Sequence, residues 1–345
     1  MLRQIRRTHP VASAAMSTLR EIAGVLVYDA IPFELRLRRD WTRIRNRNER
    51  VDANASGVRC DWRWTSDLHI ARVFPSAGLR LMRKAFAEWP IAFGDAIVDE
   101  PSPRVSFLIG HRGHARLPHL LHTIRSIAGQ RDTSIECIVV EQSPRPEVAG
   151  ALPTGVRYIH TPVPESLPYC RSWAFNVAAR AARGDVLILH DNDTVVPSRY
   201  AAAAYDAIAA GYDFANIVRF VFYLRSTEPT LDEPPERAVQ NTQGLSVIAR
   251  RNAYFAIGGY DEAFVGWGGE DNDFWDRAAT MRVQRYGSVP MMHLWHAPQP
   301  EKALGDRAPA VARYRELEQQ SPQARIARLT EVDFGHPDRP PTEGG

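Results

Sequence analysis

An acidic triplet follows a short apolar run near the middle of the chain. Residues 186–190 (VLILH) lead directly into Asp191, Asn192 and Asp193. Two carboxylates at positions i and i+2 can hold a hard divalent cation and a ribose hydroxyl, and oxygen ligands suit Mg²⁺ or Mn²⁺ bridged to substrate phosphates. Acidic pairs are also common in turns and helix caps, so the preceding apolar run is what favours a binding site here.

A second acidic cluster lies in the sequence WGGEDNDFW, residues 267–275. Its two glycines allow a mobile backbone that approaches a ligand closely. Glu270, Asp271 and Asp273 stand at the expected start of a helix that runs to Thr280. Such acids can simply complement the helix dipole, but this explanation does not account for the tryptophan and the two glycines beside them. A buried carboxylate beside a mobile loop is suited to remove a proton from a hydroxyl group.

Two histidines three residues apart, His293 and His296, follow an apolar run that contains Val289 and Met291. Histidine is a common ligand of transition metals. Their spacing either brings both rings together on a helical turn or leaves only one of them facing a site. With the acidic triplet about 100 residues earlier, they would complete an oxygen and nitrogen shell, which favours Mn²⁺ over Mg²⁺.

Alternating strands and helices are expected to position these side chains. Short apolar runs predict four strands, at 105–109, 135–141, 156–160 and 186–190. Apolar residues at helical spacing predict three helices, at 115–128, 169–183 and 198–210. This alternation indicates an α/β fold with a mostly parallel, Rossmann-like sheet flanked by helices. Ligands bind beyond the carboxyl ends of the strands in such sheets, which is where the acidic triplet falls.

The composition indicates a globular protein with several parts. Of its 345 residues, 44% are hydrophobic and 24% are charged, which excludes a disordered, collagen-like or multi-span membrane protein. The sequence PSP at 101–103 is expected to separate a mainly helical N-terminal extension, 1–100, from a domain over 101–300. Residues 301–345 are expected to form a helical tail with a disordered end.

The positive charge is concentrated in the N-terminal extension. The formal net charge is only +3, so attraction to nucleic acid is not expected. Residues 1–100 carry 17 basic and 12 acidic side chains, and the basic ones are densest at 35–50. This stretch either rests on an anionic membrane surface or is a solvated helix face. Because no apolar run resembles a membrane span or a secretory signal, we expect a cytoplasmic protein, peripheral at the inner face of the membrane if the basic stretch binds there.

Five motifs occur in an order that resembles nucleotide-sugar glycosyltransferases of GT-A fold. They are FLIGHR at 107–112, the acidic triplet DND, GGYDEAF at 258–264, WGGEDNDF at 267–274 and HLWH at 293–296. The segment from Gly258 to Arg277 is similar to the carboxyl-terminal motif of the family 7 β-1,4-galactosyltransferases and to chondroitin-polymerase-like members of family 2. The resemblance covers about residues 104–298, and WGGED is its most specific part.

The resemblance implies a set of metal ligands. Asp193 would bind Mn²⁺ (or Mg²⁺) directly, and Asp191 would face the ribose or reach the metal through water. His296 matches the metal-binding histidine of the family. His293 stands where the galactosyltransferases have a methionine ligand.

The resemblance also implies catalytic and donor-binding residues. Asp271 matches the catalytic base, and Glu270 matches the neighbouring acid that contacts the acceptor. Trp267 matches the tryptophan of a mobile loop that closes over both substrates. The other residues expected at the donor are Arg112, Arg171, Asn176, Gly268 and Gly269. Arg171 and Asn176 fall on a helix that packs beside the nucleotide, where a surface residue and a polar packing residue are equally good interpretations.

The implied reaction is a metal-dependent, inverting sugar transfer in polysaccharide assembly. Galactose, N-acetylgalactosamine or a similar sugar would move from a nucleotide diphosphate, expected to be UDP, to a glycan or glycolipid. A sugar-phosphate nucleotidyltransferase is an alternative, but its glycine-rich loop is poorly matched by GHRGHAR at 110–116. An inactive module that binds nucleotide sugars or carbohydrates is a second alternative, although DND and WGGED keep their acids. The segment 223–242 is either an acceptor-side loop or an inert surface loop.

Overall fold

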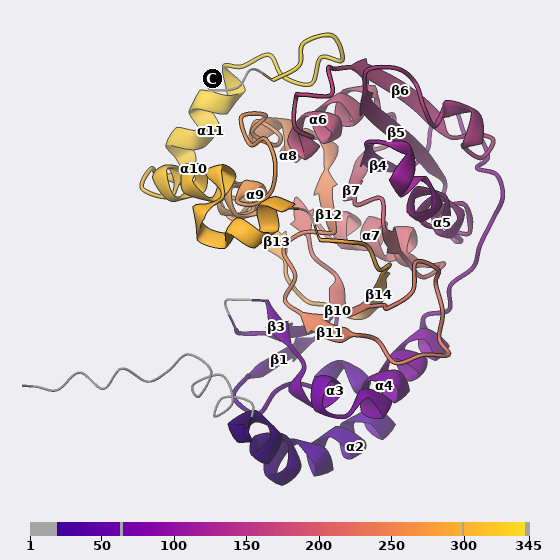
Figure 1. Cartoon of the computed structure of the whole chain (residues 1–345), viewed down its shortest axis with the longest axis vertical. Coiled ribbons are helices and arrows are strands. Elements are labelled where there is room, and N and C mark those ends of the chain that lie inside the picture. Colours follow the sequence, from indigo (N-terminus) through magenta and orange to yellow (C-terminus); the bar gives the residue numbers. More distant parts are fainter. Residues whose placement is uncertain (1–18, 63–64, 299, 342–345) are drawn as a thin grey trace, which may run out of the picture.

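The computed structural model describes residues 19–62, 65–298 and 300–341. Figure 1 shows the N-terminal helices at one end of the long axis, a small sheet next to them, and a large sheet with the C-terminal helices at the other end. The basic start of the chain, 1–18, and the expected disordered end of the tail, at 342–345, lie outside the described residues.

A seven-stranded sheet forms the centre of the larger part. Its strands are β4 (Val105–His111), β5 (Ile135–Ser143), β6 (Arg157–Pro162), β7 (Val186–His190), β9 (Phe214–Ala215), β12 (Ser246–Arg250) and β13 (Val283–Gln284). Their order is β13-β9-β12-β7-β4-β5-β6. The four strands β4 to β7 are parallel, whereas β12 runs antiparallel to β7 and β9. The predicted α/β fold with a mostly parallel sheet is therefore confirmed.

Helices cover both faces of this sheet, which explains why its strands are apolar throughout. All seven residues of β4 are buried, as expected when both faces are covered. Phe107 and Ile109 pack toward α5 (Leu117–Ala128) and α7 (Tyr200–Ala209). Leu108, between them, packs toward α6 (Arg171–Ala181), α8 (Arg251–Ala256) and α9 (Glu270–Ala278). Each such side chain contributes about 1.5–3 kcal/mol by leaving water.

The predicted strands and helices are all present, with ends that differ by a few residues. The helix expected at 169–183 is the shorter α6, because Cys170 caps its start and Ala182 is already extended. The helix expected at 115–128 is preceded by a short 3-10 turn, η3 (His114–Arg116), and a second such turn, η4 (Ala149–Ala151), follows β5. The helix expected to reach Thr280 ends at Ala278.

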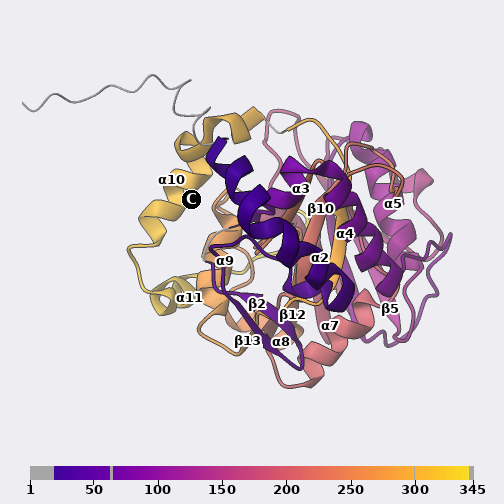
Figure 2. The same cartoon turned by 90° about the horizontal axis from the view of Figure 1, so that it is seen from below.

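A smaller, five-stranded sheet packs against the N-terminal extension. Its strands, in order, are β3 (Ser66–Asp67), β11 (Arg237–Gln240), β10 (Val218–Tyr223), β14 (Val289–His293) and β8 (Thr194–Val195). The extension contains η1 (Val25–Asp29), α2 (Ala30–Arg39), η2 (Trp41–Arg43), α3 (His69–Val73), α4 (Pro75–Glu88) and the hairpin β1 (Val51–Asn54) and β2 (Gly57–Cys60). Phe33, Leu81 and Met82 share one core cluster with Phe220 and Phe222 of β10. Figure 2 shows α2, α3 and α4 at this end of the molecule.

The tail packs against α9 rather than extending from the domain. It contains η5 (Pro300–Arg307), α10 (Pro309–Leu317) and α11 (Pro322–Thr330), and Figure 1 shows the last two beside α9. Arg325 of α11 is 2% exposed, and its Nη1 lies 2.8 Å from Oδ1 of Asp273 in α9. Within the described ranges, no helix is both long and apolar enough to cross a bilayer.

Candidate functional site

A cavity of about 600 Å³ lies at the carboxyl ends of β4 and β7. It is the position at which parallel α/β sheets bind ligands. The predicted residues that line it are Arg112, Arg171, Asp191, Asp193, Trp267, Glu270, Asp271, His293 and His296. Both ends of the segment 223–242 also line it. Residues that lie far apart in the sequence therefore meet in one cavity.

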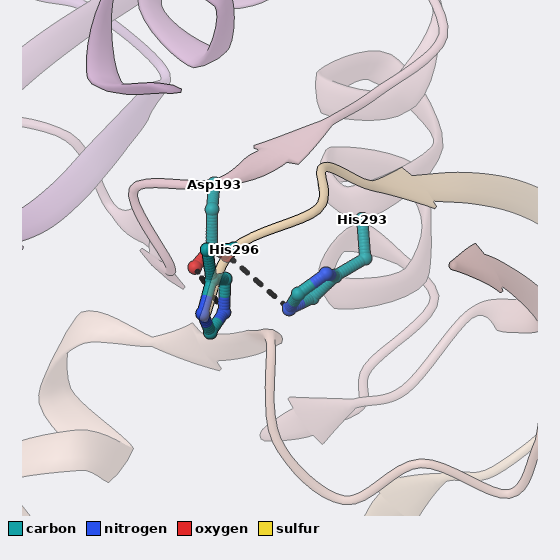
Figure 3. A group of neighbouring side chains, drawn as sticks. All are labelled: Asp193, His293 and His296. Carbon is teal, nitrogen blue, oxygen red and sulfur yellow. Dashed lines mark ion pairs between the residues drawn. The ribbon is translucent and has the colours of Figure 1, made fainter. Parts of the chain in front are cut away.

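Asp193, His293 and His296 form one group, which we call the Asp193 cluster. The antiparallel pairing of β8 with β14 sets Thr194 opposite His293, and the Leu294 amide donates to the Asp193 carbonyl at 2.8 Å. His293 Nε2 lies 3.6 Å from Asp193 Oδ1, and His296 Nε2 lies 3.3 Å from Oδ2 (Figure 3). His293 ends a strand and His296 lies in the loop after it, so both rings face the carboxylate without the helical turn considered above.

The donor atoms of the Asp193 cluster fit a divalent transition metal. One oxygen of Asp193 and one ring nitrogen of each histidine all lie within 4.8 Å of one another. Burial lowers the pKa of His293 despite the nearby carboxylate, which favours the neutral imidazole that a metal requires. Burial acts to raise the pKa of Asp193, but His293, His296 and Arg116 outweigh it and hold that pKa well below its usual range. One carboxylate and two imidazoles suit Mn²⁺ better than Mg²⁺.

Glu270 and Asp271, which we call the acidic pair, begin α9. The residue before them, Gly269, has a φ of 86°, a left-handed conformation that glycine adopts at little cost. Asp271 Oδ1 accepts hydrogen bonds from Tyr260 Oη at 2.7 Å and from Arg171 Nη1 at 2.9 Å. Its Oδ2 lies against Gly244, where an added Cβ would come within 2.4 Å. The carboxylate is thus fixed through one oxygen, and the other lies beside a residue without a side chain.

The three acids of the WGGEDND segment have different surroundings. Burial and the neighbouring Asp271 raise the pKa of Glu270 to about 7, although Arg171 acts against them. Asp273 is buried and turned away from the cavity, where it pairs with Arg277 Nη2 at 2.8 Å and with Arg325. Helix-dipole complementation therefore does not account for all three acids. Two of them face the cavity, and the third anchors the tail.

Arg171 contacts Asp191, which follows β7, and both members of the acidic pair. Its Nε donates to Asp191 Oδ1 at 2.8 Å, while its Nη1 reaches Asp271 and lies 3.7 Å from Glu270 Oε1. Burial raises the pKa of Asp191 to about 6, and Asp193 and Asp271 add to the rise while Arg171 opposes it. Among the described residues, the buried Nη2 of Arg171 has no hydrogen-bond partner. An unsatisfied buried donor in a cavity wall is suited to an anionic ligand.

Three residues that were predicted to bind the sugar donor do not line the cavity. Asn176 is fully buried, and its amide donates to the Tyr260 carbonyl at 2.8 Å and to Glu262 Oε1 at 2.9 Å, so it is the polar packing residue. Gly268 and Gly269 face the tail, where added Cβ atoms would meet Val311 and the backbone of α10. In this structure these three residues do not line the cavity, and their binding of the donor remains a prediction.

Other residues of the site were not predicted. Tyr260 lies inside the GGYDEAF motif, which is the one local signal for its contact with Asp271. Arg116 lies 3.3 Å from Asp193 Oδ2, and the Tyr223 ring stacks on His293 with centroids 4.4 Å apart. Arg112, which was predicted, lines the cavity while its guanidinium donates to carbonyls at 164–167. These contacts depend on tertiary structure that spacing does not reveal.

Two family models match the chain. Glycosyl transferase family 2 matches residues 114–264. The family described as the N-terminal domain of galactosyltransferase matches residues 234–297. The two segments together contain the whole Asp193 cluster and the acidic pair, and neither family is a nucleotidyltransferase. No curated protein matches the sequence.

Three solved structures are similar to the chain at low identity. The catalytic domain of Drosophila β1,4-galactosyltransferase 7 in complex with xylobiose is 15% identical with a TM-score of 0.34, over 52% of this chain and 63% of that one. The chain therefore spans less than two thirds of that protein. The mannosyltransferase PcManGT from Pyrobaculum calidifontis with GDP-Man and Mn²⁺ is 15% identical with a TM-score of 0.45, over 74% and 77%. A mutant of the Drosophila enzyme with manganese, UDP-Gal and xylobiose is 14% identical with a TM-score of 0.36, over 58% and 78%.

The assignment rests on the family matches, because they cover the residues that form the cavity. Residues 114–264 supply Arg171, Asp191 and Asp193, and residues 234–297 supply the acidic pair and both histidines. The chain is therefore similar to glycosyltransferases, to family 2 over 114–264 and to galactosyltransferases over 234–297.

Proposed function

We propose that this chain is a metal-dependent glycosyltransferase that uses Mn²⁺ and a UDP-sugar in polysaccharide assembly. Galactose, N-acetylgalactosamine or a similar sugar would be transferred with inversion to a hydroxyl of a glycan or glycolipid. The observation that carries the proposal is that the Asp193 cluster and the acidic pair line one cavity of about 600 Å³, in which Arg171 bonds both Asp191 and Asp271. Cavities of this size hold small-molecule ligands.

On the donor side, Asp193, His293 and His296 would hold the Mn²⁺. When bound, the ion supplies positive charge that stabilises a departing diphosphate. Arg116 lies 3.3 Å from Asp193 and carries a further positive charge on the same side of the cavity. Asp191 is expected to accept a hydrogen bond from the ribose. Arg171 holds this carboxylate through its Nε.

On the acceptor side, Asp271 is the proposed base. The acceptor oxygen forms a bond to the anomeric carbon while the bond from that carbon to the diphosphate oxygen breaks. The hydroxyl proton passes to Asp271 Oδ2, since Oδ1 already accepts from Tyr260 and Arg171. Glu270, with a pKa of about 7, holds a proton in part of the molecules at neutral pH and can donate it in a hydrogen bond to the acceptor. Attack from the face opposite the diphosphate inverts the anomeric centre.

The segment from Gly266 to Gly269 is the proposed lid. Trp267 lines the cavity, and Lys302 Nζ lies 6.0 Å from its ring centroid. Gly266, Gly268 and Gly269 have φ values of 82°, 103° and 86°, which other residues rarely adopt. Closure of this segment over the donor would exclude water, whose attack is the competing reaction.

A screen of nucleotide sugars for Mn²⁺-dependent thermal stabilisation tests the proposed function. Ligands that bind only the native state raise the melting temperature, and a concentration of 100 times Kd corresponds to about 2.7 kcal/mol. We expect UDP-galactose or UDP-N-acetylgalactosamine to stabilise the protein with Mn²⁺ and not with EDTA. Stabilisation by no nucleotide sugar, or by each of them equally without metal, would contradict the proposal.

We also propose that the N-terminal extension holds the enzyme at an anionic membrane, on its cytoplasmic face. In η1 and α2 the residues Val25, Phe33 and Leu37 are buried, whereas Ile31 and Leu35, on the opposite side, are 83% and 50% exposed. Residues 19–35 contain half of the large apolar side chains that are exposed in the described residues: Leu19, Leu26, Val27, Tyr28, Ile31 and Leu35. Basic residues continue directly after them, at 36–50. An apolar face bordered by arginines is suited to a bilayer interface that contains anionic lipids.

Co-sedimentation with lipid vesicles tests the membrane contact. The full chain should sediment with vesicles of phosphatidylethanolamine and phosphatidylglycerol and remain free with phosphatidylcholine alone. Ile31→Glu should abolish this binding, because it places a charge in the centre of the apolar face. Val332→Glu is the control, since Val332 is also exposed but lies in the tail. Equal binding by both variants would show that the face does not contact lipid.

A further inference from the structure

A second cavity, of about 340 Å³, lies beside the first. The two cavities share Thr242 and Gln243 in their walls. Arg59 of β2 and Trp62, just after this strand, line the second cavity. Trp275 of α9 and Arg285, directly after β13, line it from the other part of the chain. Part of its wall therefore comes from the N-terminal extension, outside the residues that the family models match.

Gln243 separates the second cavity from the acidic pair. Its side-chain oxygen accepts from Asn272 Nδ2 at 2.9 Å, and its carbonyl accepts from Trp275 Nε1 at 2.7 Å. Asn272 directly follows Asp271 in α9. A chain of sugars that presents one hydroxyl to Asp271 and continues across Gln243 would therefore enter the second cavity.

The two cavities differ in charge. Among the described residues, the first has five arginines and lysines and five carboxylates in its wall, whereas the second has three arginines and one carboxylate, Asp61. The guanidinium of Arg285 lies 5.6 Å from the Trp275 ring centroid, and within the described part of the chain it has no hydrogen bond or ion pair. The second cavity is thus electropositive beside an aromatic ring.

A buried arginine adds to this positive charge. Arg219 is 2% exposed, and its guanidinium bonds neutral oxygens, among them Gln240 Oε1 at 2.8 Å and the Ile44 carbonyl at 2.6 Å. Burial lowers its pKa to about 10, so it remains charged at neutral pH. A buried cation that no carboxylate contacts directly makes its surroundings favourable for an anion.

We propose that the second cavity binds an anionic sugar residue of the acceptor, next to the sugar that receives the transfer. Arg285 pairs with its carboxylate, sulfate or phosphate, because guanidinium groups bind such anions with two parallel hydrogen bonds. Arg59, whose Nη2 lies 3.6 Å from Asp52 Oδ2, adds positive charge to the same wall. Trp62, which is 36% exposed, offers an apolar face to the sugar ring. This inference rests on the proposed function and adds the class of acceptor and a role for the hairpin.

Calorimetric titration of the full chain with defined tetrasaccharides tests the inference. Tetragalacturonate, which carries carboxylates, a sulfated chitotetraose and neutral chitotetraose are the probes. At least one anionic probe should bind about tenfold more tightly than the neutral one, since a charged hydrogen bond contributes about 1.5–3 kcal/mol. The tighter of the two anionic probes identifies the anion. Arg285→Gln should weaken its binding about tenfold and leave the binding of chitotetraose unchanged.

Arg282→Gln is the matched control. Arg282 is also exposed and lies over an aromatic ring, that of Tyr212, but it is outside the second cavity. If Arg285→Gln binds the anionic probe as tightly as Arg282→Gln, or if neutral and anionic probes bind equally, the inference is wrong. Thermal stabilisation by UDP-sugar and Mn²⁺ is measured on the same samples. If the proposed function is wrong, the unsubstituted protein is not stabilised. If only the present inference is wrong, that stabilisation is kept.

Discussion

The Asp193 cluster and the acidic pair face the same cavity but are held in different ways. Asp193 follows β7 and His293 ends β14, and backbone pairing of β8 with β14 brings them together. Glu270 and Asp271 begin a helix, and side chains hold them: Tyr260 and Arg171 bond Asp271 directly. The position of the cluster therefore depends mainly on backbone register. The position of the acidic pair depends on individual side chains.

This difference predicts that single substitutions separate the two groups. Substituting a side chain of the cluster removes a ligand but leaves the backbone pairing intact. Substituting a side chain around α9 can shift the acidic pair while the cluster keeps its geometry. Metal binding then reports on the cluster alone, whereas transfer requires both groups.

Asp193→Asn should have the largest effect. It removes the charged ligand between two histidines, so Mn²⁺ affinity and the stabilisation of the leaving group are both lost. Transfer should fall roughly 10⁴-fold, equivalent to several kcal/mol of charge stabilisation. Initial rates of UDP release and a Mn²⁺ titration measure the two losses. Asp185→Asn, at the opposite end of β7, is exposed and should change neither of them; full Mn²⁺ affinity in Asp193→Asn would refute the assignment of the cluster.

Asp271→Asn should reduce transfer about a thousandfold, as expected for loss of a general base. Asparagine keeps the size of the side chain, so Mn²⁺ and UDP-sugar should still raise the melting temperature. Single-turnover transfer and thermal stabilisation, measured side by side, check both statements. Loss of donor binding together with transfer would mean that the two groups are not independent, and unchanged transfer would exclude Asp271 as the base.

The sequence was sufficient to predict the α/β class and nine of the side chains that line the cavity. Continuous apolar runs identified β4, β5 and β7, because both faces of these strands are buried. The i, i+2 acids after β7 and the WGGED motif gave the acidic residues of the cavity. Spacing alone did not reveal the small second sheet, whose short strands β3 and β8 have two residues each. The contact of Arg116 with Asp193 joins residues 77 positions apart, so no local pattern contains it.

Gly268, Gly269 and Asn176 show that the place of a residue in a sequence motif does not determine whether it faces the cavity. Gly268 and Gly269 were expected at the donor because they flank acids that do face the cavity. Their left-handed backbone instead turns them toward α10. Asn176 lies on the same helix as Arg171, but five residues correspond to about 500° of rotation, which sets the two side chains on different faces. The direction in which these residues face depends on packing against the tail, which the motif does not contain.

Arg325→Met should destabilise the protein by about 3 kcal/mol, since it removes a buried partner of Asp273 and leaves that carboxylate with Arg277 alone. Because this ion pair joins α11 to the helix of the acidic pair, transfer should decline while the Mn²⁺ affinity of the Asp193 cluster is kept. Urea unfolding and a Mn²⁺ titration measure the two effects. Arg328→Met is the control, because Arg328 is 41% exposed and pairs with Asp261 outside α9; an equal loss of stability in both variants would contradict a special role for the buried pair.

Glu270→Gln should change how stability depends on pH. Burial and Asp271 raise the pKa of Glu270 from 4.5 to about 7, so between these values the folded protein holds a proton that the unfolded chain has released. Stability therefore falls as the pH rises through this range. Glutamine does not ionise, so the variant should gain about 3 kcal/mol relative to the unsubstituted protein between pH 4.5 and pH 8.

Urea unfolding in EDTA across that pH range measures this gain without interference from bound metal. Asp191, whose pKa is also raised, titrates in both proteins, so the difference between their two curves isolates Glu270. Glutamine contacts Arg171 more weakly than glutamate does. This difference alone would shift the free energy of unfolding by the same amount at every pH. A gain that grows with pH supports a raised pKa of Glu270 in the folded protein. Parallel curves would mean that this pKa is not raised, and Glu270 would then not be the proposed hydrogen-bond donor to the acceptor.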